Sequence, residues 1–126
     1  TVPPGFDPAI FLYHEDDDLS LRLSNEFGKL YFVHDALVMH MEGQSSERSP
    51  EIAALKAWHM GRSRVYATRK HNRPMPFARA LFSALKQVFS LQVLLSSRKR
   101  AKHIAYLQGV ISAWRFLNKS RITNND

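Results

Sequence analysis

Four consecutive acids, Glu15, Asp16, Asp17 and Asp18, stand between two apolar runs in the stretch FLYHEDDDLSLRL, residues 11–23. A carboxylate in the first turn of a helix stays ionised, because the helix dipole and the free N–H groups favour its charged form. An ionised carboxylate can accept the proton of a sugar or alcohol hydroxyl while that hydroxyl attacks another atom. The residue types and their position therefore indicate a general base.

The same cluster has two simpler interpretations. Acids at a helix start complement the dipole by about 0.3–1 kcal/mol each, although one or two acids would be enough for that. By spacing, Asp16 and Asp18 also form a D-x-D pair that could bind Mg²⁺ or Mn²⁺, but so short a pattern is weak evidence by itself. Capping, catalysis and cation binding all stay open on these residues alone.

A helix that carries the acids is predicted from about residue 16 to residue 27, and Gly28 ends it. Two segments after it, KLYFVH at 29–34 and ALVMHM at 36–41, are rich in residues that favour strands. They predict two short buried strands. The acidic helix and the strands together predict a small α/β unit.

The rest of the chain predicts helices. Ser49 followed by Pro50 is a favourable helix start, with an oxygen cap and then proline in the first turn. The segment HNRPMP, residues 71–76, ends that helix. Apolar residues at steps of three or four predict two further helices, over residues 77–95 and 104–117. Polar side chains interrupt the first of these two, so we do not expect it to span a bilayer.

Charge divides the chain into the same two regions. Residues 1–48 contain nine acids and three cations, whereas residues 49–126 contain two acids and fifteen cations. Different partners are expected for an acidic head and a basic tail. The chain has no cysteine, which excludes a disulfide framework and a thiolate metal site and fits a reducing compartment.

One run of cations stands out in the basic region. The stretch SSRKRAKH, residues 96–103, contains Arg98, Lys99, Arg100 and Lys102. Such a run is commonly a solvated helix start. It could equally contact anionic lipid headgroups, at about 1 kcal/mol for each cation near the surface.

The first acidic stretch resembles a segment of the family 2 glycosyltransferases that reads G-F-D-x-x-F-F-x-Y-x-E-D-x-D-L-x-x-R. The residues that match at the family's spacing are Gly5, Phe6, Asp7, Phe11, Tyr13, Glu15, Asp16, Asp18, Leu19 and Arg22. Residues 33–40 continue the resemblance with the pattern V-x-D-A-x-V-x-H. RSRVYATRKHNRP is similar to the family's basic helix that ends in Lys-His. The resemblance covers about the first 73 residues.

This resemblance implies a role for each matching acid. Asp16 would be the catalytic base of an inverting sugar transfer, and Glu15 would help to bind the acceptor. Asp18 and Arg22 would orient the helix on the acceptor side through hydrogen bonds and an (i, i+4) ion pair. The family's metal-binding D-x-D lies upstream of this motif, so Asp16 and Asp18 are not that pair. His40 would complete the site of a divalent metal, Mg²⁺ or Mn²⁺, with a structural histidine as the alternative.

The resemblance also implies a fold and partners. The fold class would be α/β to mainly α, a C-terminal fragment of a GT-A fold with one acidic helix and two short strands, followed by about three basic amphipathic helices. Residues 1–48 would be the acceptor-side part of the transferase domain, and residues 49–126 a basic helical region. The nucleotide-binding N-terminal half is not among these residues, so we expect the isolated chain to be inactive and to bind no metal by itself.

In the intact enzyme the partners would be a nucleotide-sugar donor and a saccharide or lipid-linked acceptor. We expect a cytoplasmic location, with the inner face of the membrane and its anionic surface as a further possibility. A strand edge without a partner predicts a homo-oligomer. The competing hypothesis is a non-catalytic basic helical module that binds an acidic partner, a membrane surface or nucleic acid. Nucleic acid is the least favoured of these, because basic and aromatic residues are not interleaved.

Overall fold

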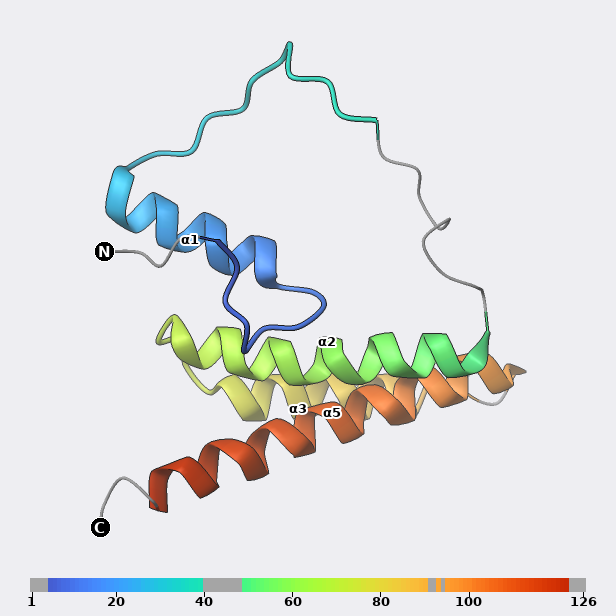
Figure 1. The fold of residues 1–126 in the computed structure, drawn as a ribbon. Coiled ribbons are helices and arrows are strands. Elements are labelled where there is room, and N and C mark those ends of the chain that lie inside the picture. Colours follow the sequence, from blue (N-terminus) through green and yellow to red (C-terminus); the bar gives the residue numbers. More distant parts are fainter. Residues whose placement is uncertain (1–4, 40–48, 91–92, 94, 123–126) are drawn as a thin grey trace.

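The computed structural model describes residues 5–39, 49–90, 93 and 95–122, with no side-chain detail for the last four of these. It contains four labelled helices: α1 (Glu15–Phe27), α2 (Pro50–Lys70), α3 (Pro76–Val88) and α5 (Ser97–Ile122). Figure 1 shows α2, α3 and α5 packed side by side, with α1 lying over α2. α2 and α5 run in the same direction, and α3 runs in the opposite one.

The expectation of a GT-A fragment with two strands is wrong, because no residue in the described part of the chain forms a strand. Residues 29–39 instead form an irregular arch that rises away from the helices (Figure 1). Phe32 and Met39 are 91% and 96% exposed. Strand-forming residues stabilise a sheet only through neighbouring strands and burial, and this segment has neither. Residues 40 and 41 of the second predicted strand lie outside the described residues.

The predicted helix starts and stops are largely confirmed. α1 covers the four acids and is followed by Gly28, whose N–H donates to the Ser24 carbonyl at 3.1 Å. α2 begins with the expected cap, since the Ile52 N–H donates to Ser49 Oγ at 3.2 Å and Pro50 is the first helical residue. It ends at Lys70, just before the HNRPMP segment.

Two helix boundaries differ from the prediction. α3 ends at Val88 and not at residue 95, and both the N–H and the hydroxyl of Ser90 donate to the Gln87 carbonyl beyond that end. Through these bonds, Ser90 provides hydrogen-bond donors for a carbonyl group of the last turn, and the helix ends there. α5 begins at Ser97, inside the basic run, and is longer than the predicted helix over residues 104–117.

Small residues form the centre of the three-helix packing. The buried core residues are Ala57, Val65, Ala80, Ala84, Ala105, Tyr106, Val110, Ala113 and Leu117. A Cβ atom at Gly61 would collide with the Tyr106 carbonyl oxygen, and one at Gly109 with the Trp58 carbonyl oxygen. The two glycines therefore allow α2 and α5 to approach backbone to backbone.

α1 and the loop that precedes it are each attached to this bundle. Ser63 Oγ on α2 donates to the Phe11 carbonyl at 3.2 Å, and Asp18 contacts the C-terminal end of α2. None of the described helices is both long enough and apolar enough to cross a membrane.

Candidate functional site

The four acids of α1 lie in different environments. Consecutive helical residues are rotated by about 100°, so neighbouring side chains point in different directions. Asp18 is completely buried against α2, whereas Asp16 and Asp17 are exposed. The acidic run therefore combines one anchoring carboxylate with carboxylates that are accessible to other molecules.

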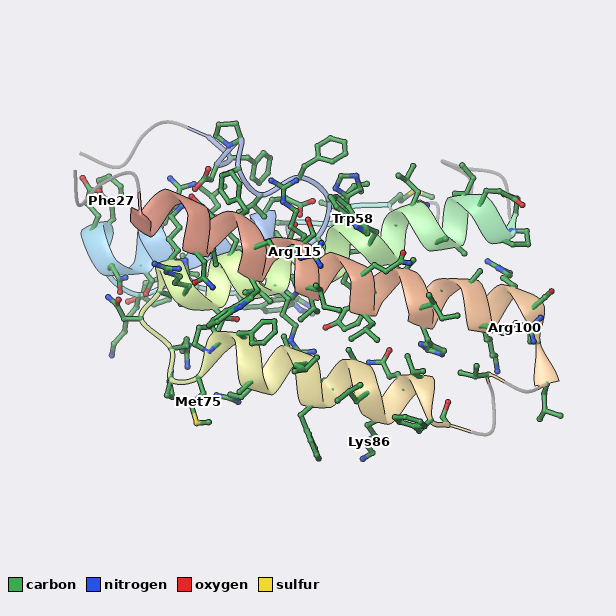
Figure 2. All side chains as sticks on the ribbon, turned by 90° about the horizontal axis from the view of Figure 1, so that it is seen from below. Phe27, Trp58, Met75, Lys86, Arg100 and Arg115 are labelled. Atoms are coloured by element: carbon green, nitrogen blue, oxygen red, sulfur yellow. The ribbon has the colours of Figure 1, made fainter. Side chains whose placement is uncertain are left out.

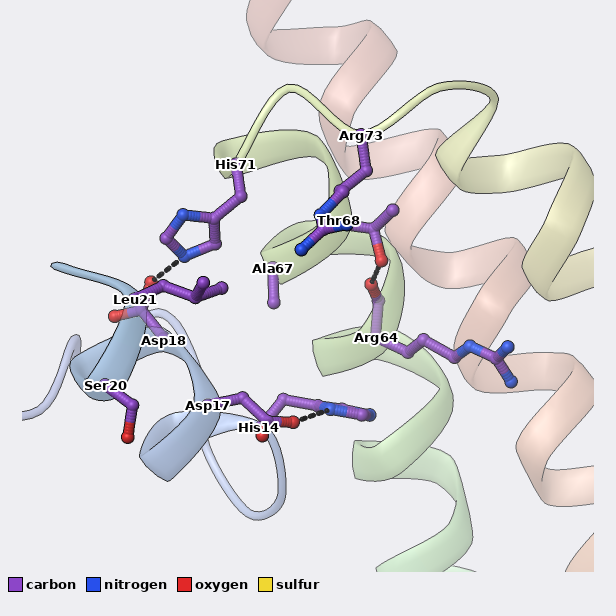
Figure 3. Close-up of a pocket in the computed structure, with 10 residues that line it drawn as sticks. All are labelled: His14, Asp17, Asp18, Ser20, Leu21, Arg64, Ala67, Thr68, His71 and Arg73. Carbon is purple, nitrogen blue, oxygen red and sulfur yellow. Dashed lines mark hydrogen bonds and ion pairs between the residues drawn. The ribbon is translucent and has the colours of Figure 1, made fainter. Parts of the chain in front are cut away.

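Three basic side chains surround Asp18. Arg22 Nε donates to its Oδ2 at 2.9 Å, which is the expected (i, i+4) pair. Lys70 Nζ lies 2.8 Å from its Oδ1, and His71 Nε2 lies 2.9 Å from the same oxygen. Lys70 is the last residue of α2 and His71 follows it, so these contacts fix α1 to that helix. Figure 3 shows the contact between His71 and Asp18. We call these four residues the Asp18 cluster.

The loop before α1 joins the cluster through two more contacts. Lys70 Nζ donates to Asp7 Oδ2 at 2.6 Å, and an Arg22 guanidinium nitrogen donates to the Gly5 carbonyl at 2.6 Å. Gly5, Asp7, Asp18 and Arg22 all belong to the sequence motif described above. Their contacts give these matching residues a shared structural task, which is to hold the start of α1 in place.

The cluster also sets the charge of its members. Burial alone would raise the pKa of Asp18, but hydrogen bonds from Lys70, His71 and Arg22 outweigh it and hold the pKa below its usual value. Burial would likewise lower the pKa of Lys70, and the carboxylates of Asp18 and Asp7 raise it instead. Asp18 is thus an ionised, fully partnered carboxylate.

Asp16 and Glu15 are arranged differently. Asp16 is exposed in the first turn of α1, and its Oδ1 accepts the Asp17 N–H at 2.9 Å. Glu15 Oε2 is buried and finds no hydrogen-bond partner among the described residues. The exposed Asp16 carboxylate can accept hydrogen bonds from hydroxyl groups of a bound molecule, whereas the buried Glu15 Oε2 is closed to them.

The backbone that leads into these acids is held in an uncommon conformation. Leu12, Tyr13 and His14 have φ values of 60°, 68° and 68°. Left-handed residues that are not glycine cost about 1–2 kcal/mol each, so three in succession persist only where surrounding contacts hold them. The Ser63 bond to the Phe11 carbonyl is one such contact, and the His14 ring nitrogen 3.0 Å from Asp17 Oδ2 is another.

A cleft of about 400 Å³ separates α1 from the second half of α2. His14, Asp17 and Ser20 line its α1 side, while Arg64 and Arg73 line the opposite side (Figure 3). Arg73 points toward the cleft, whereas the Arg64 side chain points away from α1, toward the other helices (Figure 3). Arg64 is fixed by donating to the Tyr106 hydroxyl at 2.9 Å.

Two further cavities are lined by cations. Arg64, Arg73 and Arg79 line one of about 220 Å³ beside α3. A larger one, of about 430 Å³, lies between α2 and the start of α5. Three of the four cations predicted to contact anions, Arg98, Lys99 and Lys102, line the larger cavity; Arg100 is not among its lining residues.

The described residues do not provide a metal site. Within them, no group of three or more His, Asp or Glu side chains is arranged to hold an ion. Asp18 is also unsuited to a D-x-D metal pair with Asp16, because basic side chains already occupy its oxygens. His40, the predicted metal ligand, lies outside the described residues.

Some residues of the site could not be found from the sequence. Lys70 and His71 match the Lys-His end of the family's basic helix, but nothing local pairs them with an acid 52 or 53 positions earlier. No sequence pattern points to Lys56, which lines the larger cavity together with the three predicted cations.

Comparisons of the chain with family models, with curated proteins and with solved structures found no match.

Proposed function

We propose that this chain is the acceptor-side portion of an inverting glycosyltransferase, with Asp16 as the general base. The observation that carries the proposal is the division of roles within one acidic turn. Asp18 is buried and held by three basic side chains, which leaves Asp16 exposed at a fixed position of α1. The resemblance of residues 5–22 to the family 2 motif supports the same assignment.

The chemistry follows from these positions. Asp16 accepts the proton of an acceptor hydroxyl while the hydroxyl oxygen forms a bond to the anomeric carbon of an activated sugar. The bond from that carbon to the phosphate oxygen breaks, and the nucleotide diphosphate leaves with the electron pair. Attack from the face opposite the leaving group inverts the configuration. Glu15, the half-buried neighbour of Asp16 in the same turn, helps to bind the acceptor.

Asp18 is unsuited to act as the base, although it is also an ionised aspartate. Its oxygens already accept hydrogen bonds from Arg22, Lys70 and His71. A proton transferred to Asp18 would break these bonds inside a buried site, which costs more than protonation of an exposed carboxylate. The role of Asp18 and Arg22 is to position Asp16.

The experiment is to replace Asp16 by asparagine in the full-length enzyme and to measure sugar transfer to the acceptor. Asp16→Asn keeps the size of the side chain and removes its basicity, so we expect the rate to fall by roughly 10²–10⁴-fold. Asp17→Asn is the matched control, because Asp17 is also exposed in the same turn. Near-normal turnover of a folded Asp16→Asn enzyme would show that another group is the base.

A second candidate function is a non-catalytic basic helical module that binds an anionic partner. It is favoured by the two cavities that are lined by cations, one of them by Arg64, Arg73 and Arg79. A salt-sensitive mobility shift of nucleic acid by this chain, together with unchanged transfer in the Asp16→Asn enzyme, would favour the module over the transferase.

A further inference from the structure

The cavity between α2 and the start of α5 combines cations from two separate parts of the chain. Lys56 reaches it from α2, and Arg98, Lys99 and Lys102 reach it from the first turns of α5. No aspartate or glutamate is found among its lining residues in the described part of the chain. The side chains of these four cations therefore line a shared space of about 430 Å³.

The backbone adds to this positive potential. The N-terminus of a helix carries a partial positive charge, and α5, with 26 residues, begins at this cavity. Ser96, which also lines the cavity, caps the helix: its Oγ accepts the Lys99 N–H at 3.4 Å. Helix starts of this kind favour phosphate groups when cations stand beside them.

The positive charges of this region also affect the nearby His103. Burial lowers the pKa of His103, and the charges of Lys102 and Lys99 lower it further. Ala53, Ala57 and Met60 of α2 add apolar surface on the same helix as Lys56, and Tyr13 also lines the cavity. The cavity therefore suits a ligand with a multiply charged group attached to an uncharged body.

We propose that this cavity is a binding site for a phosphoryl group, a phosphate or diphosphate held between Lys56 of α2 and the cations at the start of α5. Four cations and a helix N-terminus match a ligand with two or more negative charges, and the volume admits a diphosphate. The site depends on neither the general base nor sugar transfer. The phosphoryl group belongs either to a soluble molecule or to a lipid headgroup, two sources with the same recognition chemistry.

Lys56 provides the decisive test, since it is remote in sequence from the basic run. Calorimetric titration of the 126-residue chain with pyrophosphate, at constant ionic strength, measures the affinity. Lys56→Gln and Lys102→Gln should each weaken binding by about tenfold, because each removes a charged hydrogen-bond donor. Lys102 is exposed, so its variant keeps the test valid if Lys56→Gln does not fold.

Two control variants remove a charge elsewhere. Lys86 lies on α3, on the side that points away from the other helices in Figure 2, and Arg115 is exposed in the second half of α5. Lys86→Gln and Arg115→Gln should change the affinity by less than about twofold, because salt screens distant exposed charges. Equal losses in all four variants, an unchanged affinity in Lys56→Gln and Lys102→Gln, or no binding of pyrophosphate would overturn the proposal.

Vesicles identify the source of the phosphoryl group. Vesicles of phosphatidylcholine mixed with phosphatidic acid should displace pyrophosphate if the site takes a lipid headgroup, and vesicles of phosphatidylcholine alone should not. If neither kind displaces it while the Lys56→Gln loss holds, the site is assigned to a soluble phosphorylated ligand. Displacement by pure phosphatidylcholine would contradict recognition of a phosphoryl group through charge.

Discussion

Asp18 shows how the environment of one residue separates it from identical neighbours. It is completely buried, and its partners Arg22, Lys70 and His71 come from both helices that it joins. Replacing one member of a buried ion cluster leaves the remaining charges without compensation. The contribution of Asp18 to stability should therefore far exceed that of the exposed acids beside it.

We predict that Asp18→Ala lowers the free energy of unfolding by about 3–5 kcal/mol, the usual cost of breaking a buried pair from one side. Asp16→Ala, in the same helical turn but exposed, should change it by less than about 1 kcal/mol. Urea unfolding monitored by circular dichroism measures both variants. Similar small losses in the two variants would show that Asp18 does not anchor α1.

The cluster should also make stability depend on pH. The pKa of Asp18 lies below its usual value of 3.8, so near that pH the unfolded chain binds more protons than the folded one. The stabilisation is present above about pH 4 and is lost as the pH falls through the lowered pKa. For Lys70 the pKa lies above its usual value of 10.5, so its contribution is present below that pH and is lost as the pH rises through the raised pKa.

Urea midpoints measured as the pH falls below about 4 test whether protonation of Asp18 destabilises the fold. The acid decline should be shallower in Asp18→Asn than in the unmodified chain. Asp35→Asn, on the exposed arch, should leave the decline unchanged. An equally steep decline in Asp18→Asn would mean that other groups cause the acid sensitivity.

At the scale of elements, the contact between α2 and α5 depends on two glycines. Gly61 and Gly109 each face a carbonyl group of the other helix with no space for a side chain. Glycine in a helix is otherwise unfavourable by roughly 0.5–1 kcal/mol relative to alanine. Helix propensity therefore predicts that a glycine-to-alanine change at these positions stabilises the protein, whereas packing predicts that it destabilises the protein.

We predict that Gly109→Ala lowers the free energy of unfolding by at least about 2 kcal/mol, because the added methyl group forces the two backbones apart. Gln108→Ala, one position earlier on an exposed face, should have an effect within about 0.5 kcal/mol. Thermal or urea unfolding of both variants provides the comparison. A more stable Gly109→Ala protein would show that α2 and α5 are not in backbone contact.

At the scale of the whole molecule, apolar exposure is concentrated on the arch between α1 and α2. Tyr31, Phe32 and Val38 are 82%, 91% and 87% exposed. A contiguous apolar segment in water favours association through burial of its surface. Residues 29–39, the described part of the two predicted strands, form no strand, so the reason to expect an oligomer is now the exposed side chains.

We predict that the chain self-associates and that changing Tyr31, Phe32 and Val38 together to serine reduces the association. Sedimentation velocity over a range of protein concentrations measures it. Phe89→Ser is the matched control, because Phe89 is 83% exposed at the end of α3. A monomer at every concentration would contradict the prediction, as would association that Phe89→Ser abolishes and the triple variant does not.

The local features of this protein could be predicted from its sequence. Ser49 and Pro50 at the start of α2, Gly28 after α1, and the acids in the first turn of α1 all act within a few residues along the chain. Capping, dipole and proline effects depend only on such neighbours. The (i, i+4) pair of Asp18 and Arg22 is local in the same sense.

Tertiary structure decided the features that depend on distant partners. The strand-forming residues of the arch have no neighbouring strand in the described chain, so their propensity has no effect. On α3 the buried positions are Ala80 and Ala84, while Leu85 of the predicted apolar stripe is 38% exposed. Which carboxylate is anchored and which is accessible follows from the contacts of Asp18 with Lys70 and His71. Such contacts join residues that only folding brings together, and local sequence patterns contain no information about them.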